Sequence, residues 1–107
     1  MVIYSETAKL DLIDTLYGLI TWEKHTITIE HAERYVDDIV DVIDTICTKT
    51  FHRNCTHPSH LKFGNKIYTY KRNSNTTWYF IYNWDKVNRI AYINKITNNH
   101  ITALRIS

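Results

Sequence analysis

The feature that most constrains this chain is a change in the spacing of its apolar residues near Phe51. Before that point, apolar residues recur every three or four positions, which is the spacing of helices that bury one face. After it, β-branched and aromatic residues form runs with a period of two, which is the spacing of half-buried strands. The first half therefore predicts helices and the second half predicts a sheet.

The chain of 107 residues is long enough for one two-layer core, and we expect a single domain over residues 1–107. Only two glycines and one proline occur, so no composition break marks a linker. No apolar run approaches the roughly 20 residues that cross a bilayer. Two cysteines are too few for a disulfide framework. We therefore expect no membrane contact and a cytoplasmic location.

The first half predicts a short strand at residues 2–4 and then two helices. Ser5 is the expected N-cap of the first helix and Thr28 that of the second. The second helix carries an acidic side that is most simply solvated. The first helix is expected to bury one apolar face, formed by Ala8, Leu12, Ile13, Leu16, Leu19 and Ile20.

The second half predicts three consecutive strands within residues 65–72, 76–83 and 89–96. On the middle strand, Trp78, Phe80 and Tyr82 point to one face of the sheet, and Tyr79 and Ile81 point to the other. The expected fold is α+β, a two-layer sandwich in which an N-terminal strand and a helical hairpin pack on a mainly antiparallel sheet, in the order β-α-α-β-β-β. The face away from the helices is expected to be polar and exposed.

Charge is divided unequally between the two halves. Residues 1–50 contain four Lys or Arg and ten Asp or Glu, whereas residues 51–107 contain nine Lys or Arg and a single acid. This asymmetry favours contact between the sheet and a polyanion or an acidic partner. The alternative is that the two halves neutralise each other within one domain.

The stretch FHRNCTHPSH is the strongest candidate for a metal site. His52, Cys55, His57 and His60 are separated by gaps that zinc ligands also show. However, the chain lacks two ligand couples separated by a longer insert, and its predicted fold is large enough to form without a metal. We therefore expect no metal and no other cofactor.

Three stretches resemble the RelE/ParE superfamily of bacterial toxins: YSETAKLDLIDTL on the first helix, LKFGNKIY at the start of the sheet, and WYFIY on its central strand. The resemblance covers nearly the whole chain. It implies a RelE/ParE-like fold and the toxin role in a type II toxin-antitoxin pair, with a cognate antitoxin bound in a hetero-oligomer.

The resemblance also implies a target. RelE-, YoeB- and HigB-like members are endoribonucleases that cut mRNA on the ribosome, with the RNA 2′-hydroxyl as nucleophile, and this is the activity we expect. The alternatives are a ParE-like toxin that binds DNA gyrase without an enzymatic step, or a degenerate member that chiefly binds its antitoxin.

By position, the resemblance assigns catalytic roles to His100, Tyr79 and Arg72. Lys71 and Arg72 match a phosphate-binding basic pair, and His100 matches a histidine that transfers protons. Tyr79 stands where the family's nucleases carry an arginine, and it can stack on a base or donate a hydrogen bond. The alternatives are that the basic pair protects a sheet edge and that His100 is an exposed tail residue.

Three further residues extend the expected RNA-binding surface. Lys62 and Lys66 flank the turn that leads into the sheet, where their charges can attract phosphates. His60 borders the same surface and is the second candidate for proton transfer, because an unperturbed histidine titrates near neutral pH.

Overall fold

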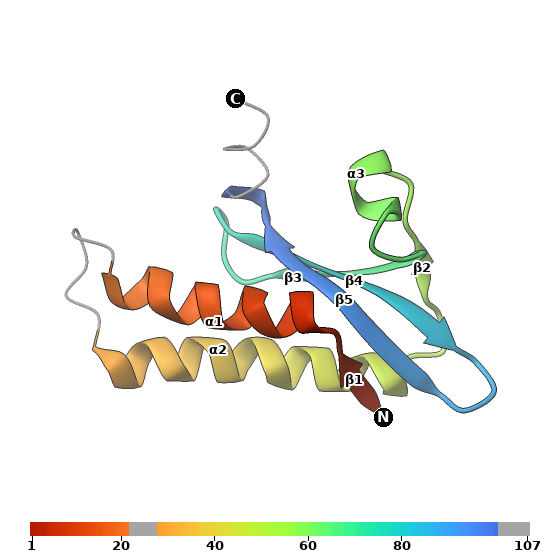
Figure 1. Ribbon diagram of the computed structural model, residues 1–107, viewed down its shortest axis with the longest axis horizontal. Coiled ribbons are helices and arrows are strands. Elements are labelled where there is room, and N and C mark those ends of the chain that lie inside the picture. The colour runs from red at the N-terminus through yellow and green to blue at the C-terminus, as the bar shows by residue number, and fades with distance from the viewer. Residues whose placement is uncertain (22–27, 101–107) are drawn as a thin grey trace.

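The computed structural model describes residues 1–21 and 28–100 as an α+β domain. Figure 1 shows α1 and α2 side by side along one face of a five-stranded sheet, and α3 beyond the other face. No helix in the described ranges is long and apolar enough to cross a membrane. The elements are β1 (Val2–Tyr4), α1 (Glu6–Thr21), α2 (Ile29–Asp44), the 3-10 helix η1 (Thr45–Thr48), β2 (Arg53–Asn54), α3 (Pro58–Leu61), β3 (Lys66–Lys71), β4 (Thr77–Asp85) and β5 (Ile90–Asn98).

The strand order is β1-β5-β4-β3-β2, with β1 parallel to β5 and every other pair antiparallel. This confirms the predicted α+β class, the three-stranded meander and the place of the N-terminal strand in the sheet. The two short elements β2 and α3 were not predicted. They lie in the histidine-rich stretch, where the sequence has no apolar period.

Both predicted helix caps are confirmed. The Ser5 side-chain oxygen accepts a hydrogen bond from the Ala8 backbone N–H at 3.0 Å. The Thr28 hydroxyl accepts one from the His31 backbone N–H at 3.1 Å. Each cap satisfies one of the N–H groups that a helix leaves without a partner at its start.

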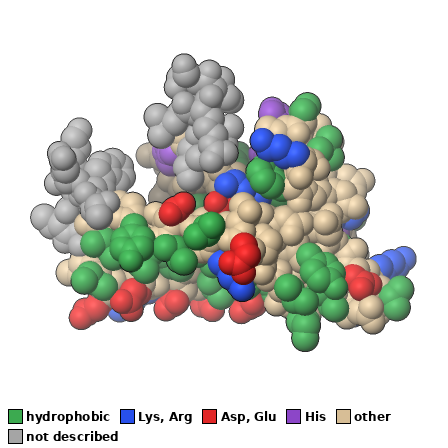
Figure 2. Space-filling view, in the orientation of Figure 1, with side chains coloured by type: hydrophobic (Ala, Val, Ile, Leu, Met, Phe, Trp, Pro, Cys, Tyr) green, Lys and Arg blue, Asp and Glu red, His purple; other side chains and the backbone are tan. Residues whose placement is uncertain are grey.

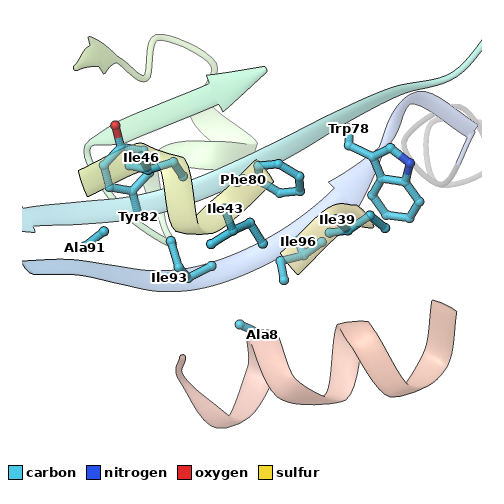
Figure 3. Packing of buried hydrophobic residues seen from close by; sticks show 10 residues of the cluster. All are labelled: Ala8, Ile39, Ile43, Ile46, Trp78, Phe80, Tyr82, Ala91, Ile93 and Ile96. Carbon is cyan, nitrogen blue, oxygen red and sulfur yellow. The ribbon is translucent and has the colours of Figure 1, made fainter. Parts of the chain in front are cut away.

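The main core lies between the sheet and the two long helices. Trp78, Phe80 and Tyr82 point from β4 toward the helices and are at most 2% exposed, as the alternation predicted. We call this the inner face of the sheet. Figure 3 shows Phe80 meeting Ile43 of α2, with Ala8 of α1 on the far side of the cluster. Burial of large apolar side chains supplies most of the free energy that holds the two layers together.

Helix α1 lies along the edge of β5 at the place where β1 ends. The Asp11 carboxylate accepts a hydrogen bond from the Ile96 backbone N–H at 2.9 Å and pairs with the Lys95 ammonium at 2.9 Å. The Asp11 side chain therefore accepts the hydrogen bond that a neighbouring strand would otherwise accept from the Ile96 N–H group. Because α1 turns one side toward β5, the prediction that Ile13 is buried was wrong, and its side chain is 47% exposed.

The opposite face, which carries Tyr79 and Ile81, is called the outer face here. It is less open than predicted, because the segment from Cys55 to Phe63 folds over part of it and forms a small apolar cluster with Ile67 and Ile81. Just after this segment, the chain approaches β4 closely at Gly64, where an added Cβ would lie 2.7 Å from the Tyr82 carbonyl oxygen. Glycine is therefore needed at this approach.

Candidate functional site

A pocket of about 320 Å³ opens on the outer face of the sheet. Strands β3 and β4 contribute alternate residues that point away from the helices, and β2 and the segment after it contribute the walls. Most of its lining side chains are polar or titratable. The lining residues are Ile67, Thr69 and Tyr79 from β3 and β4, with Arg53, Asn54, Thr56, His57 and His60 from β2 and the segment after it.

His60 contacts Tyr79 inside this pocket. Their ring centroids are 5.7 Å apart, and the centroid of the His57 ring lies 5.3 Å from that of His60. The one-turn helix α3 brings the two histidines together, because residues three apart lie on the same side of a helix. Burial lowers the pKa of His60 below its usual 6.5, and the nearby charge of His57 lowers it further. His60 is therefore mainly neutral at pH 7 and can accept a proton.

His57 is held in one tautomer by its neighbour. Its Nδ1 accepts a hydrogen bond from the Ser59 backbone N–H at 3.2 Å, and the Ser59 hydroxyl lies 2.6 Å from the same atom. A backbone N–H can only donate, so Nδ1 must be the acceptor and the ring proton of neutral His57 lies on Nε2. In this state His57 can donate a hydrogen bond to an anion, and the role of proton acceptor falls to His60.

One cation lines the pocket, and a second lies on the same face of the sheet. Arg53 lines its wall, and in the described parts of the chain no carboxylate forms an ion pair with it. Lys71 is exposed and shares the outer face with Thr69, one pleat or roughly 7 Å further along β3. A phosphate bound at the pocket can therefore meet the Arg53 guanidinium, and Lys71 adds positive charge to the same face of the sheet.

Cys55 is the first residue of the segment that covers the outer face, and its side chain is only 7% exposed. Burial raises the pKa of its thiol, although the charge of Arg53 opposes this effect. A buried thiol with a raised pKa is a poor nucleophile. Cys55 therefore belongs to the small apolar cluster and contributes no covalent chemistry to the pocket.

The predicted pair Lys71 and Arg72 is not brought together. The Arg72 guanidinium stacks on the Tyr35 ring of α2 at 3.7 Å from its centroid and pairs with the Asp38 carboxylate at 3.2 Å. It also donates a hydrogen bond to the Tyr70 hydroxyl at 3.4 Å. Arg72 thus holds β3 to α2 on the inner side of the sheet, away from Tyr79.

The two other predicted lysines also lie outside the pocket lining. The Lys66 ammonium donates a hydrogen bond to the Asn54 side-chain oxygen at 2.5 Å, and Lys66 is opposite Tyr82 in the sheet. Its side chain therefore belongs to the inner face. The Lys62 ammonium lies 5.1 Å from the centre of the Phe63 ring and is exposed just after α3.

His100 lies at the start of β4, where its Nε2 is 3.1 Å from the Thr76 hydroxyl oxygen. Thr76 precedes Tyr79 by three residues, which corresponds to roughly 10 Å along a strand. His100 and Tyr79 are thus separated along the sheet, and of the two predicted proton-transfer residues only His60 lines the pocket.

The four candidate metal ligands are divided between the two faces. The His52 Nδ1 lies 2.7 Å from the Tyr82 hydroxyl, and the His52 ring stacks on Trp84 at 4.0 Å. Since Tyr82 points to the inner face, His52 is separated from His57 and His60. In residues 1–21 and 28–100, no three His, Cys, Asp or Glu side chains are arranged to hold a metal ion.

Sequence reasoning missed Arg53, the cation of the pocket wall. The only available signal was a basic residue between His52 and Cys55 in a stretch without strand or helix periodicity.

None of the three comparisons, with protein-family models, with curated proteins and with solved structures, returned a match.

Proposed function

We propose that this chain is a RelE/ParE-like toxin that cleaves mRNA on the ribosome in the bacterial cytoplasm, and that a cognate antitoxin is its protein partner. The observation that carries the proposal is the contact between His60 and Tyr79 in a pocket lined by Arg53, with Lys71 on the same face of the sheet. A neutral histidine, an aromatic ring and unpaired cations are the groups that cleavage of single-stranded RNA requires.

In the proposed reaction, the RNA 2′-oxygen attacks the adjacent phosphorus while the bond from phosphorus to the 5′-oxygen breaks. His60 takes the proton from the 2′-hydroxyl and then supplies it to the departing 5′-oxygen. The products are a 2′,3′-cyclic phosphate and a 5′-hydroxyl, so atoms and charge balance without a second substrate. His57 donates a hydrogen bond from Nε2 to a phosphate oxygen.

Arg53 supplies the charge that the central strand lacks. Tyr79 occupies the place where the resemblance leads us to expect an arginine, and a tyrosine carries no positive charge at neutral pH. Arg53 reaches the same pocket from β2. It can hold the phosphate through two parallel hydrogen bonds while Tyr79 stacks on a neighbouring base.

A binding toxin without enzymatic activity, directed at DNA gyrase or only at its antitoxin, is the second candidate. It is favoured by the intramolecular contacts of Arg72 and Lys66, which remove two of the predicted cations from the outer face. A gyrase supercoiling assay separates the candidates. Inhibition of supercoiling by a chain that does not cut mRNA supports the binding toxin.

The proposal is tested by adding the purified chain to translating ribosomes and measuring cleavage of a defined mRNA. Arg53→Ala is expected to reduce the cleavage rate by about 100-fold, the usual effect of removing one charge-stabilising donor. Arg34→Ala, an exposed arginine on α2, is the matched control and is expected to leave the rate unchanged. A folded wild-type chain that cuts no mRNA would contradict the proposal.

A further inference from the structure

Helix α1 is apolar on two sides. One side packs against the core through Ala8 and Leu12. The other side exposes Leu10, Ile13 and Tyr17, whose exposed fractions are 56%, 47% and 62%. These three residues follow the spacing i, i+3, i+7, so they form one stripe along the helix, called here the α1 stripe.

Hydrophobic side chains gather over α1 in the space-filling view, and a row of acidic side chains runs along α2 below them (Figure 2). Single exposed apolar residues are common on folded proteins, but several on one side of a helix, with charged residues beside them, indicate an interaction surface.

The charges around the α1 stripe are mostly negative. Asp14 lies within the stripe, four residues after Leu10 and three before Tyr17, and its side chain is exposed. In the described parts of α1 and α2, the ion pairs engage only Glu6, Asp11 and Asp38. The exposed acids of α2 outside these pairs are Glu30, Glu33, Asp37, Asp41 and Asp44.

This charge selects among the surfaces that could cover the stripe. A second copy placed stripe against stripe would bring Asp14 and its neighbours against the same acids, which is unfavourable. An anionic lipid surface would be repelled for the same reason. A helix with an apolar side bordered by Lys or Arg would bury the three apolar residues and pair with the acids.

We propose that the α1 stripe is a docking site for a basic amphipathic helix of another protein. Such a helix places apolar side chains at positions i, i+3 and i+7 against Leu10, Ile13 and Tyr17. Its flanking cations meet Asp14 and the acidic row of α2. Because α1 packs on the opposite side of the sheet from the pocket, the docked helix leaves the pocket of His60 and Tyr79 open. The docking site does not depend on the proposed RNA cleavage.

The experiment uses two synthetic helical peptides of about three heptads, with Leu at positions a and d. One peptide carries Lys at e and g, and its match carries Glu there. Calorimetric titration of the full chain is expected to show one-to-one binding of the Lys peptide, at least about tenfold tighter than that of the Glu peptide. Higher salt is expected to weaken it.

Three variants of the chain complete the test. Ile13→Asp and the milder Ile13→Gln are expected to weaken binding of the Lys peptide by about tenfold or more. Val87→Asp alters a valine that is 90% exposed on the β4–β5 hairpin, and it is expected to bind like the wild type. Circular dichroism confirms that each variant is folded.

Equal binding of the Lys and Glu peptides, no binding of either, or full binding by both folded Ile13 variants would overturn the proposal. A concentration-dependent dimer that Ile13→Asp dissociates would assign the stripe to a second copy instead. Binding to vesicles rich in phosphatidylserine that Ile13→Asp abolishes would assign it to a membrane surface.

Discussion

Replacing Asp11 with alanine removes the contact that fixes α1 to the sheet. The Asp11 carboxylate holds the Lys95 ammonium and the Ile96 backbone N–H, each at 2.9 Å. The side chains of Asp11 and Lys95 are only 13% and 11% exposed, so water cannot readily replace the lost partner. Asp11→Ala therefore leaves a buried charge and a backbone N–H group unsatisfied.

The burial of the Asp11–Lys95 ion pair determines how much stability Asp11→Ala removes. Removing one partner of a buried ion pair costs about 3–5 kcal/mol of unfolding free energy. A domain of this length loses about 4 °C of melting temperature per kcal/mol, so we expect a decrease of about 12–20 °C. Small domains have a total stability of only about 5–15 kcal/mol, and the variant is expected to be marginally folded at 25 °C.

Urea unfolding monitored by circular dichroism measures the change in the free energy of unfolding. Asp14→Ala removes an exposed carboxylate from the same helix and is the matched control, with an expected change within about 0.5 kcal/mol. Asp11→Asn keeps an acceptor for the Ile96 N–H and is expected to cost less than Asp11→Ala. If Asp11→Ala costs no more than Asp14→Ala, the Asp11 contact does not hold α1 in place.

The remaining predictions concern two glycine substitutions and the pH dependence of RNA cleavage. Gly64→Ala is expected to destabilise the chain by about 1–3 kcal/mol because its Cβ would lie 2.7 Å from the Tyr82 carbonyl oxygen. Gly18→Ala, a helix position with nothing within 4 Å, is expected to stabilise it by about 0.5–1 kcal/mol. Equal urea midpoints for the two variants would contradict this. Because the pKa of His60 is lowered from 6.5, RNA cleavage is expected to fall with decreasing pH only below pH 6.5. His57→Asn removes the Coulombic effect by which His57 lowers the pKa of His60. The pKa of His60 is therefore expected to rise, and this limb of the pH–rate profile is expected to shift to higher pH. A shift of this limb to lower pH would contradict the assignment of His60 as the proton acceptor.

Periodicity predicted most of the fold. The apolar period of α2 and the alternation on β4 were strong signals, because buried residues such as Ile43 and Phe80 set both patterns. The N-caps Ser5 and Thr28 were equally clear, because their hydroxyl groups satisfy backbone donors locally. These features depend on neighbours in the sequence, and sequence alone was sufficient to find them.

The remaining features depend on contacts between distant segments. The exposure of Ile13 follows from the position of α1 beside β5. Helix α1 carries apolar residues on two sides, and its sequence does not indicate which side packs on the sheet. Arg53 lines the pocket because β2 pairs with β3. A strand of two residues is too short to show a periodic pattern in the sequence.

The separation of Lys71 and Arg72 was partly predictable. Neighbouring residues on a strand point to opposite faces, so Lys71 and Arg72 were poorly placed to serve one phosphate. The aromatic and acidic partners that hold Arg72 on the inner side come from α2, and its sequence gave no sign of this contact.

We propose that proton transfer takes place at His60 in the pocket and not at His100 beside the start of β4. Ribosome-dependent mRNA cleavage by the wild type, His60→Ala and His100→Ala at pH 7 tests this proposal. We expect His60→Ala to lower the rate by about 100-fold or more and His100→Ala to leave it within a few-fold of wild type. Wild-type cleavage that depends on His100 and persists in folded His60→Ala would contradict the account.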